Sequence, residues 1–270
     1  MSNSTNTLNG KALVTGASSG IGATYAERLA QRGHDLVLVA RDLSRLEALA
    51  ARLRDTGVKV DVLQADLTSP ADLARVESRL REDADIGVLV NNAGVAVPGK
   101  LVDTDVDRVD SMLQLNITAP TRLAHAAAKA FSARGRGAII NIASVTALMP
   151  EGFSGTYSGT KAYILNLSQS MSSELHDAGV QVQAVLPGIT RTEIWDRSGV
   201  GMHGLPAEMI MEVHELVDAA LAGFELGEVV TIPSLPDVAD WNAFSAARAA
   251  LQPNLSRAHA ATRYGVTQAN

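Results

Sequence analysis

The stretch "LVTGASSGIG", residues 13–22, decides the fold. A short apolar run ends at Val14, and Gly16, Gly20 and Gly22 follow it with the spacing G-x-x-x-G-x-G. Glycines between a strand and a helix let backbone N–H groups approach a pyrophosphate, whose charge the helix N-terminus stabilises. The stretch therefore predicts a dinucleotide-binding turn, although a tight turn alone also requires glycine for steric reasons.

Short apolar runs alternate with longer helical patterns on both sides of this turn. The runs expected to form strands are 12–14, 35–40, 59–64, 87–91, 137–142, 180–186 and 228–232. The patterns expected to form helices are 20–32, 43–56, 70–82, 105–133, 156–178, 214–222 and 237–251. Such alternation indicates right-handed βαβ units. The predicted fold is α/β, a doubly wound Rossmann fold with a seven-stranded parallel sheet and helices on both faces.

The chain of 270 residues has room for one large α/β domain. No linker, composition shift or internal repeat divides it. We expect a disordered tail at residues 1–8, a single domain at 9–251 with an insertion at 193–213, and a C-terminal extension at 252–270.

Composition excludes several classes of function. The net charge of −6 argues against nucleic-acid binding, and the absence of cysteine excludes disulfides, thiolate metal sites and a cysteine nucleophile. The six histidines show no spacing typical of metal ligands. The polar N-terminus lacks the apolar core of a signal peptide, and no apolar run could cross a bilayer. A cytoplasmic protein without metal is expected.

A second stretch, "TYSGTKAY" at residues 156–163, combines two tyrosines with one lysine. On a helix, Tyr157 and Lys161 lie on one face, whereas Tyr163 and Lys161 do not. A nearby ammonium favours the phenolate, so Lys161 is expected to lower the pKa of Tyr157 toward the working range of a general base. The alternative is an exposed helical pair without chemistry, and we assign Tyr163 to packing.

Taken in order, the motifs resemble those of the classical short-chain dehydrogenases/reductases, from residue 9 to about 192. The matching pieces are Thr15-Gly16-x-x-x-Gly20-Ile21-Gly22, Asp66-Leu67, Asn91-Asn92-Ala93-Gly94, Asn116, Ser144, Tyr157-x-x-x-Lys161, and Pro187-Gly188 with Thr192. Each piece alone is common, and their order on the predicted strand ends is specific.

The resemblance implies a reaction and a set of roles. Tyr157 would be the general acid and base, Lys161 would tune it and bind the nicotinamide ribose, Ser144 would polarise the substrate carbonyl, and Asn116 would hold a water in the proton relay. The cofactor would supply the hydride. The residues expected to bind it are Gly16, Ser18, Ser19, Gly20, Ile21, Gly22, Arg41, Asp66, Leu67, Asn92, Ala93, Gly94, Tyr157, Lys161, Pro187, Gly188, Ile189 and Thr192.

The choice of cofactor depends on the end of the second strand, "LVLVARD". Arg41 follows the apolar run directly and would bind the 2′-phosphate of NADP(H), and Ser18 and Ser19 would add hydrogen bonds. Asp42 would cap the next helix. The alternative takes Asp42 as the ligand of the ribose in NAD(H), which we expect less.

The substrate is expected to be a small molecule, a moderately apolar ketone or secondary alcohol. The residues assigned to its pocket are Leu148, Phe153, Trp195 and Met202. The glycine-hinged insertion at 193–213 is interpreted as a lid that excludes water, or alternatively as a surface loop.

Two other functions are alternatives, a 3-oxoacyl-thioester reductase and a dinucleotide-sensing regulator, and the sequence also bears on the oligomeric state. A 3-oxoacyl-thioester reductase would need a basic docking patch, yet Ser172 and Ser173 stand where arginine is frequent and only Arg134 and Arg136 are near. A dinucleotide-sensing regulator would not need Tyr157. The alanine-rich helices at 105–133 and 156–178 favour a homo-oligomer, either a dimer or a tetramer, with no nucleic-acid or membrane partner. The ending "GEVVTIPSLPDVADW" departs from the family's usual C-terminus, which places the tetramer contacts in question.

Overall fold

The computed structural model describes residues 8–152, 154–193 and 206–266. Phe153, Trp195, Met202 and most of the insertion expected at 193–213 lie outside these residues. Two compact units divide the chain, Met1–Pro233 and Ser234–Asn270. The sequence had extended the main domain to residue 251, so the helix expected at 237–251 belongs instead to the second unit.

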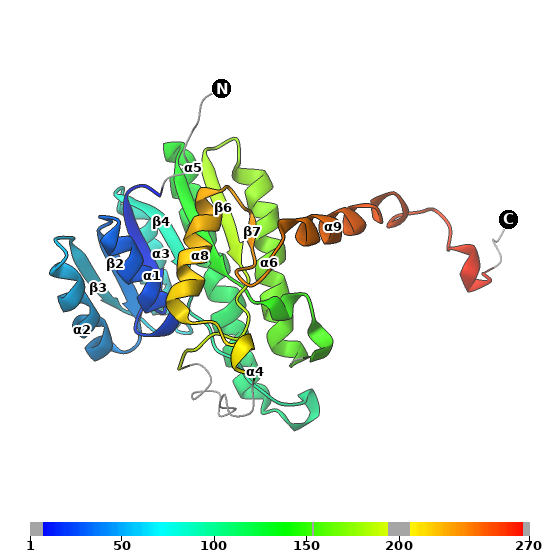
Figure 1. Cartoon of the computed structure of the whole chain (residues 1–270), viewed down its shortest axis with the longest axis horizontal. Coiled ribbons are helices and arrows are strands. Elements are labelled where there is room, and N and C mark those ends of the chain that lie inside the picture. The colour runs from blue at the N-terminus through cyan, green and yellow to red at the C-terminus, as the bar shows by residue number, and fades with distance from the viewer. Residues whose placement is uncertain (1–7, 153, 194–205, 267–270) are drawn as a thin grey trace. The chain divides into compact units, whose positions relative to one another are not determined.

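The first unit is built on seven parallel strands in the order β3-β2-β1-β4-β5-β6-β7 (Figure 1). This is the predicted doubly wound sheet. The strands are β1 Lys11–Thr15, β2 Leu36–Ala40, β3 Val60–Gln64, β4 Ile86–Asn91, β5 Gly137–Ile142, β6 Val180–Val185 and β7 Val230–Thr231.

The helices of the first unit connect these strands. They are α1 Gly20–Gln31, α2 Leu43–Arg54, α3 Pro70–Glu82, α4 Val106–Leu113, α5 Ala119–Arg134, α6 Gly155–Leu175 and α8 Val213–Glu225. Short helical turns lie at η1 Leu101–Asp103, η2 Gln114–Thr118, η3 Val145–Ala147, η4 Pro150–Gly152 and η5 Ala207–Met209. The second unit contains α9 Val238–Ala249, η6 Gln252–Asn254 and η7 Thr262–Tyr264.

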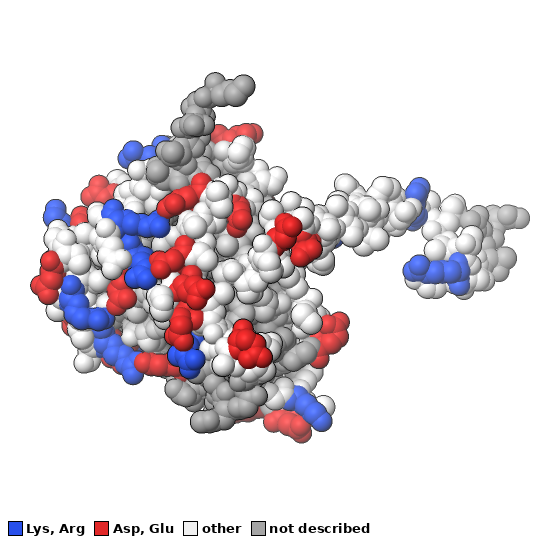
Figure 2. Space-filling model, viewed as in Figure 1, with Lys and Arg blue, Asp and Glu red and all other residues white. Residues whose placement is uncertain are grey.

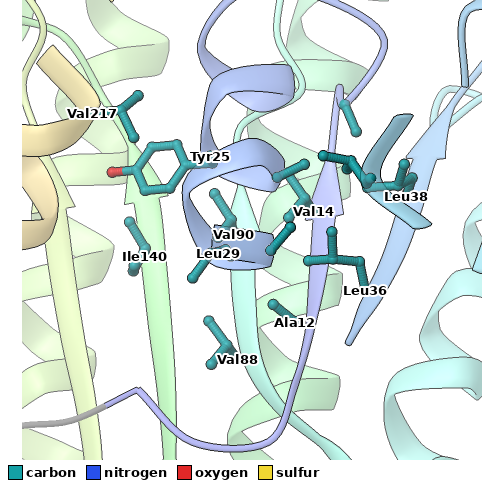
Figure 3. Close-up of a cluster of buried hydrophobic side chains, with 14 of the residues drawn as sticks. Ala12, Val14, Tyr25, Leu29, Leu36, Leu38, Val88, Val90, Ile140 and Val217 are labelled. Carbon is teal, nitrogen blue, oxygen red and sulfur yellow. The ribbon is translucent and has the colours of Figure 1, made fainter. Parts of the chain in front are cut away.

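Alternation along each strand divides the core between the two faces of the sheet. On one face, Ala12 and Val14 of β1 pack in a cluster with residues of α1, α2 and α8. Leu13 points to the other face, where the cluster includes residues of α3, α5 and α6. Figure 3 shows Tyr25 of α1 extending toward Val217 of α8 and Ile140 of β5.

The helix expected at 105–133 is interrupted, which corrects the sequence prediction. One π-helical turn, Gln114–Thr118, separates α4 from α5. Its central residue, Asn116, is 2% exposed and hydrogen-bonds both backbone groups of Val95 beyond β4. Helical periodicity cannot reveal this contact, and a π turn of this kind is frequent at functional sites.

Ion pairs lie on the surface of the first unit. Figure 2 shows acidic and basic side chains interspersed on the face formed by α1, α2 and α8. Arg28 and Arg32 of α1 pair there with Asp218 and Glu225 of α8, at 2.6 Å each. Such exposed pairs contribute little to stability, so burial of the two apolar clusters is the main driving force for this architecture.

Candidate active site

The glycine turn after β1 lies against the loop that follows β4. A Cβ atom on Gly16 would lie 2.8 Å from Asn92 Nδ2 and 2.9 Å from the Ala93 Cα, and its φ of +65° is itself unfavourable for other residues. At Gly22, a Cβ atom would lie 2.4 Å from the Gly16 carbonyl oxygen. Only glycine fits both positions, which brings the first turn of α1 close to the ends of two strands.

Thr15 joins these two loops at the carboxyl end of β1. Its Oγ1 donates to the Val90 carbonyl at 3.2 Å and accepts from the backbone N–H groups of Asn92 at 2.9 Å and Ala93 at 3.1 Å. The Asn92 side chain donates in turn to the Thr15 carbonyl oxygen at 2.9 Å. The cradle expected to hold the dinucleotide is therefore fixed by side chains beneath it.

Tyr157 and Ser144 meet at the carboxyl end of β5. Tyr157 lies in the first turn of α6 and is half-buried, with the Ser144 side chain near its hydroxyl. Burial raises the pKa of the Tyr157 hydroxyl to about 12, and its interaction with the Ser144 hydroxyl opposes that rise. The sequence analysis expected a lowered pKa. In the protein alone desolvation dominates, and the tyrosine is protonated at neutral pH.

Lys161 lies one helical turn beyond Tyr157, as the spacing predicted. Its Nζ is 5.7 Å from the centroid of the Tyr157 ring and donates to the Ile142 carbonyl at 2.9 Å. The side chain is 7% exposed, and burial lowers the pKa of its ammonium to about 8. A buried lysine that faces a tyrosine contradicts the alternative of an exposed helical pair.

Asn116 supports the same cluster from the π turn. Its Oδ1 accepts from the Val95 N–H at 3.0 Å, and its Nδ2 donates to the Val95 carbonyl at 2.8 Å and to Thr160 Oγ1 at 3.1 Å. Thr160 Oγ1 donates to the Tyr157 carbonyl at 2.7 Å. Asn116 is thus connected through Thr160 to the helical turn that carries Tyr157.

A buried hydrogen-bond network of two asparagines and one serine lies near the reaction centre. Asn91 and Asn141 are directly opposite in the β4–β5 ladder, and Asn91 Nδ2 donates to Asn141 Oδ1 at 3.0 Å. Asn141 Nδ2 donates to Ser168 Oγ at 2.9 Å, and Ser168 Oγ donates to the Ile164 carbonyl at 2.7 Å. All three side chains are at most 5% exposed. This network fixes α6 in register with the strands that carry Ser144.

Asn141, Ser168 and Thr160 were not assigned to the site from the sequence, and Thr15 and Asn91 were noted only as motif members. One indication was available, since Asn91 is the last residue and Asn141 the last but one of strands that are otherwise apolar. A buried polar residue needs a partner, but the partner's identity depends on strand register.

The residues expected at the ribose end of the cofactor are exposed. Arg41 follows β2, and among the described residues its guanidinium has no hydrogen-bond or ion-pair partner, although its carbonyl accepts from Gln64 Nε2 at 2.9 Å. Asp42 is the N-cap of α2, and its Oδ1 accepts from the Arg45 N–H at 3.0 Å. The predicted capping role of Asp42 is confirmed, which leaves Arg41 as the available cation.

Arg45 connects this end of the site to the segment after β6. Its Nη1 lies 2.6 Å from Glu193 Oε2. Thr192 lies beside the glycine turn, because a Cβ atom on Gly20 would be 3.3 Å from Thr192 Cγ2. The segment Pro187–Glu193 therefore passes close to both the glycine turn and α2.

Asp66 and Leu67 form the turn after β3. Asp66 Oδ1 accepts from the backbone N–H of Thr68 at 2.9 Å and from its hydroxyl at 2.7 Å, and Leu67 is 5% exposed. These contacts fix the turn at the carboxyl end of β3, which was expected to bind the cofactor.

The described part of the expected substrate pocket is small. Leu148 is half-buried after η3, and Met149 beside it is 62% exposed. Tyr163, which we had assigned to packing, is 37% exposed and hydrogen-bonds Thr121 Oγ1 at 3.0 Å. It points away from Lys161, as its position on the helix predicted.

The described residues contain no group of histidine, aspartate and glutamate side chains that could hold a metal ion. None of the helices in the described part of the chain is long and apolar enough to cross a membrane.

The family model of the short-chain dehydrogenases matches residues 10–201. With the glycine turn, the order of the sheet and the Ser144–Tyr157–Lys161 cluster, this match defines the class. The chain belongs to the short-chain dehydrogenase family and is an oxidoreductase of the kind that uses a nicotinamide dinucleotide.

Solved structures of high similarity cover almost the whole chain. A short-chain dehydrogenase from Sphingobium yanoikuyae in complex with NADPH is 56% identical, with a TM-score of 0.91, over 94% of this chain and 100% of that one. A bulky-bulky ketone specific alcohol dehydrogenase from Comamonas testosteroni is 51% identical, with a TM-score of 0.88, over 96% and 99%.

A curated relative is more distant. The very-long-chain 3-oxoacyl-CoA reductase of Podospora anserina is 36% identical over 187 residues, which are 67% of this chain. The chain spans 55% of the length of that relative.

Proposed function

We propose that the chain is an NADP(H)-dependent oxidoreductase that interconverts secondary alcohols and ketones carrying large groups on both sides of the carbonyl. The observation that carries the proposal is the cluster at the end of β5, where Tyr157 lies beside Ser144 and the buried Lys161 lies one turn away. The similarity to a dehydrogenase named for bulky-bulky ketones supports the substrate class.

The cradle for the cofactor fits a dinucleotide phosphate. Gly16 and Gly22 let the backbone approach the pyrophosphate, and the exposed Arg41 offers a fork of donors to a 2′-phosphate. When bound, NADP(H) supplies or accepts the hydride at its nicotinamide ring. The complex of the Sphingobium yanoikuyae enzyme with NADPH supports this choice over NAD(H).

Proton transfer follows from the protonation states of the cluster. Because burial raises the pKa of Tyr157 to about 12, its hydroxyl is present as a donor at neutral pH. In ketone reduction, the Tyr157 and Ser144 hydroxyls donate hydrogen bonds to the carbonyl oxygen, and the Tyr157 proton moves to that oxygen as it becomes an alkoxide. The Lys161 ammonium, with a pKa of about 8, stabilises the phenolate that remains.

Leu148 and the apolar residues of the insertion, Trp195 and Met202 among them, would form the substrate pocket together with Phe153. The insertion would act as a lid over the carbonyl. Asn116 would position the proton relay, because it is connected through Thr160 to the helical turn that carries Tyr157.

A spectrophotometric assay with matched ketones tests the proposal. Phenyl ketones whose second substituent grows from methyl to butyl should retain or gain kcat/KM as NADPH is oxidised, and NADH should support a much lower rate. A sharp loss of activity with the longer substituent would contradict the substrate class. Equal rates with the two cofactors would contradict the role of Arg41.

Reduction of a 3-oxoacyl thioester is the second candidate, which the relative from Podospora anserina favours. The described structure speaks against an acidic carrier protein as its donor. Arg134, one of two arginines available for docking, donates instead to the Ala84 carbonyl at 2.6 Å and the Ile86 carbonyl at 2.8 Å. Turnover of a 3-oxoacyl-CoA thioester in the same assay would favour this candidate if the bulky ketones were inert.

A further inference from the structure

The C-terminal unit, Ser234–Asn270, is folded locally but has no core of its own. None of its described residues is buried. Its exposed apolar side chains are Val238 at 54%, Phe244 at 49%, Leu251 at 57%, Leu255 at 73%, Tyr264 at 63% and Val266 at 67%. Apolar surface of this extent on one short segment indicates a surface for interaction.

The helix of this unit is encoded by its own sequence. Asp237 caps α9 by accepting from the Ala239 N–H at 2.8 Å, and Arg248 lies in its last turn. Trp241 and Phe244 stack with ring centroids 5.4 Å apart. A helix of 12 residues is marginal in water without a packed face. The conformation of α9 therefore implies that its aromatic face is covered in the working protein.

Charge indicates what covers it. Residues 241–270 contain Arg248, Arg257 and Arg263 and no aspartate or glutamate. The whole chain has 23 basic and 29 acidic residues, so the remaining 240 residues carry 20 and 29, a net charge of −9. Figure 2 shows the described part of residues 241–266 with basic but no acidic side chains. A basic, apolar segment is complementary to the net negative charge of the rest of another copy of the same chain.

The similar structures retain this segment. The match to the Sphingobium yanoikuyae dehydrogenase leaves out 6% of this chain and none of that one, and the omitted part is shorter than Ser234–Asn270. The match to the Comamonas testosteroni enzyme leaves out 4%. A segment without buried residues that is nevertheless retained over this range of identity has a role beyond linking or ending the fold.

We propose that residues 238–266 form an assembly arm, which packs its aromatic face and its three arginines against the first unit of a second copy of this chain, where the net charge is negative. Exchange of two identical arms in a twofold dimer would make each contact twice, so a modest surface on each arm gives a stable pair. The proposal concerns assembly and goes beyond the proposed reaction.

The first test removes the aromatic face. Sedimentation equilibrium should show that Trp241→Ala with Phe244→Ala raises the dimer dissociation constant by about tenfold or more, because large aromatic side chains dominate interface energies. Asn242→Ala, an exposed polar position on the same helix, is the matched control and should leave the constant unchanged. A chain ending at Pro233 should dissociate at least as readily, with circular dichroism as the check that its first unit is folded.

The second test reverses the charge. Arg248→Glu, Arg257→Glu and Arg263→Glu together should weaken association, whereas the same three positions changed to Lys should restore it. Added salt should weaken the wild-type dimer more than the glutamate variant. A dissociation constant that is insensitive to salt and to the three glutamates would overturn the proposed complementarity of charge.

The third test distinguishes a second copy from the arm's own chain. Because the protein has no cysteine, Ser245→Cys gives a single labelling site beside Phe244. An environment-sensitive fluorophore there should shift to shorter wavelength as protein concentration rises through the dimer range. A shift already complete in the monomer would mean that the arm packs on its own chain, and no shift at any concentration would mean that it packs on neither. Either result would overturn the proposal.

Discussion

The two ends of the cofactor site are built in different ways. At the reaction centre, Ser144 and Lys161 are at most 8% exposed, and each is bonded to neighbouring strands or loops. At the ribose end, Arg41, Asp42 and Arg45 are all exposed, and the contacts of Asp42 and Arg45 with each other and with Glu193 lie at the surface. The first arrangement is preorganised by burial, whereas the second can reorient when a ligand arrives.

The comparison separates chemistry from selectivity. Substitution in the buried cluster leaves unpaired groups and misplaced reacting atoms, so it should affect turnover or folding strongly. Substitution at the exposed end changes only the contacts made with the cofactor. Five experiments, from the largest expected effect to the smallest, examine this division.

Tyr157→Phe should lower kcat by about a thousandfold or more, because it removes the proton donor and leaves the fold intact. Steady-state kinetics with the reduced cofactor measures the loss, and calorimetry should show cofactor binding nearly unchanged. Tyr163→Phe, which removes the other tyrosine hydroxyl of α6, is the control and should retain turnover. Indifference of the protein's activity to Tyr157→Phe would favour a dinucleotide sensor.

Arg41→Asp should weaken NADP(H) binding by about 2–3 kcal/mol, the upper range for a charge-assisted contact, and should leave NAD(H) binding unchanged or improved. Its kcat with saturating NADPH should stay near the wild-type value. Dissociation constants for both cofactors, measured by fluorescence quenching, give the comparison. A variant that keeps its preference for NADP(H) would show that another residue reads the 2′-phosphate.

Asn141→Ala should lower the free energy of unfolding by about 1–3 kcal/mol, because it removes two buried hydrogen bonds, the one from Asn91 Nδ2 and the one to Ser168 Oγ. Urea denaturation measures the change. Gln181→Ala, on the next strand and half-buried, is the matched amide control and should have a smaller effect. Equal losses at the two positions would indicate that the buried hydrogen-bond network has no special role.

Lys161 predicts how stability depends on pH. Burial lowers its pKa to about 8 in the folded chain, against about 10.4 for an unfolded lysine. Between these values the unfolded chain binds more protons, so raising the pH from about 8 to 9.5 should stabilise the cofactor-free protein relative to Lys161→Met by about 1–2 kcal/mol. Denaturant titrations of both proteins at the two pH values measure the difference. A constant difference would mean that Lys161 stays protonated in the folded chain throughout this range, as it does in the unfolded chain.

Arg45→Gln should have the smallest effect, less than about threefold on the dissociation constant for either cofactor, because its pair with Glu193 is exposed. It is also the matched control for Arg41→Asp, one turn along the same segment. A loss as large as that of Arg41→Asp would place the 2′-phosphate between the two arginines and would weaken the contrast between them.

Most of the sheet and the position of the reaction centre could be predicted from the sequence, because both depend on local patterns. The apolar runs predicted β5 at its observed bounds, and the four-residue spacing brought Tyr157 and Lys161 together. The π turn at Asn116 could not be predicted, because it is stabilised by Val95 and Thr160, which are distant in sequence.

The remaining differences have the same cause. The expected lowering of the Tyr157 pKa considered its charged neighbour but not its desolvation, which depends on the complete fold. The boundary after Pro233 depends on where tertiary contacts end. The helical pattern of residues 237–251 does not indicate which tertiary contacts those residues make. Local patterns determine elements, whereas burial and long-range pairing determine what those elements do.

The two ends of the insertion before α8 are joined by one β-bridge. Thr190 and Met211 form a parallel bridge, in which the Met211 N–H donates to the Ile189 carbonyl at 2.9 Å and the Arg191 N–H donates to the Met211 carbonyl at 3.0 Å. Because the two ends are joined there, a change in the length of the segment between them adds little to the entropy of closing it. Under the proposed function, a longer or shorter chain between Thr190 and Met211 would therefore change the substrate range, while the sheet and its proton donor stay as they are.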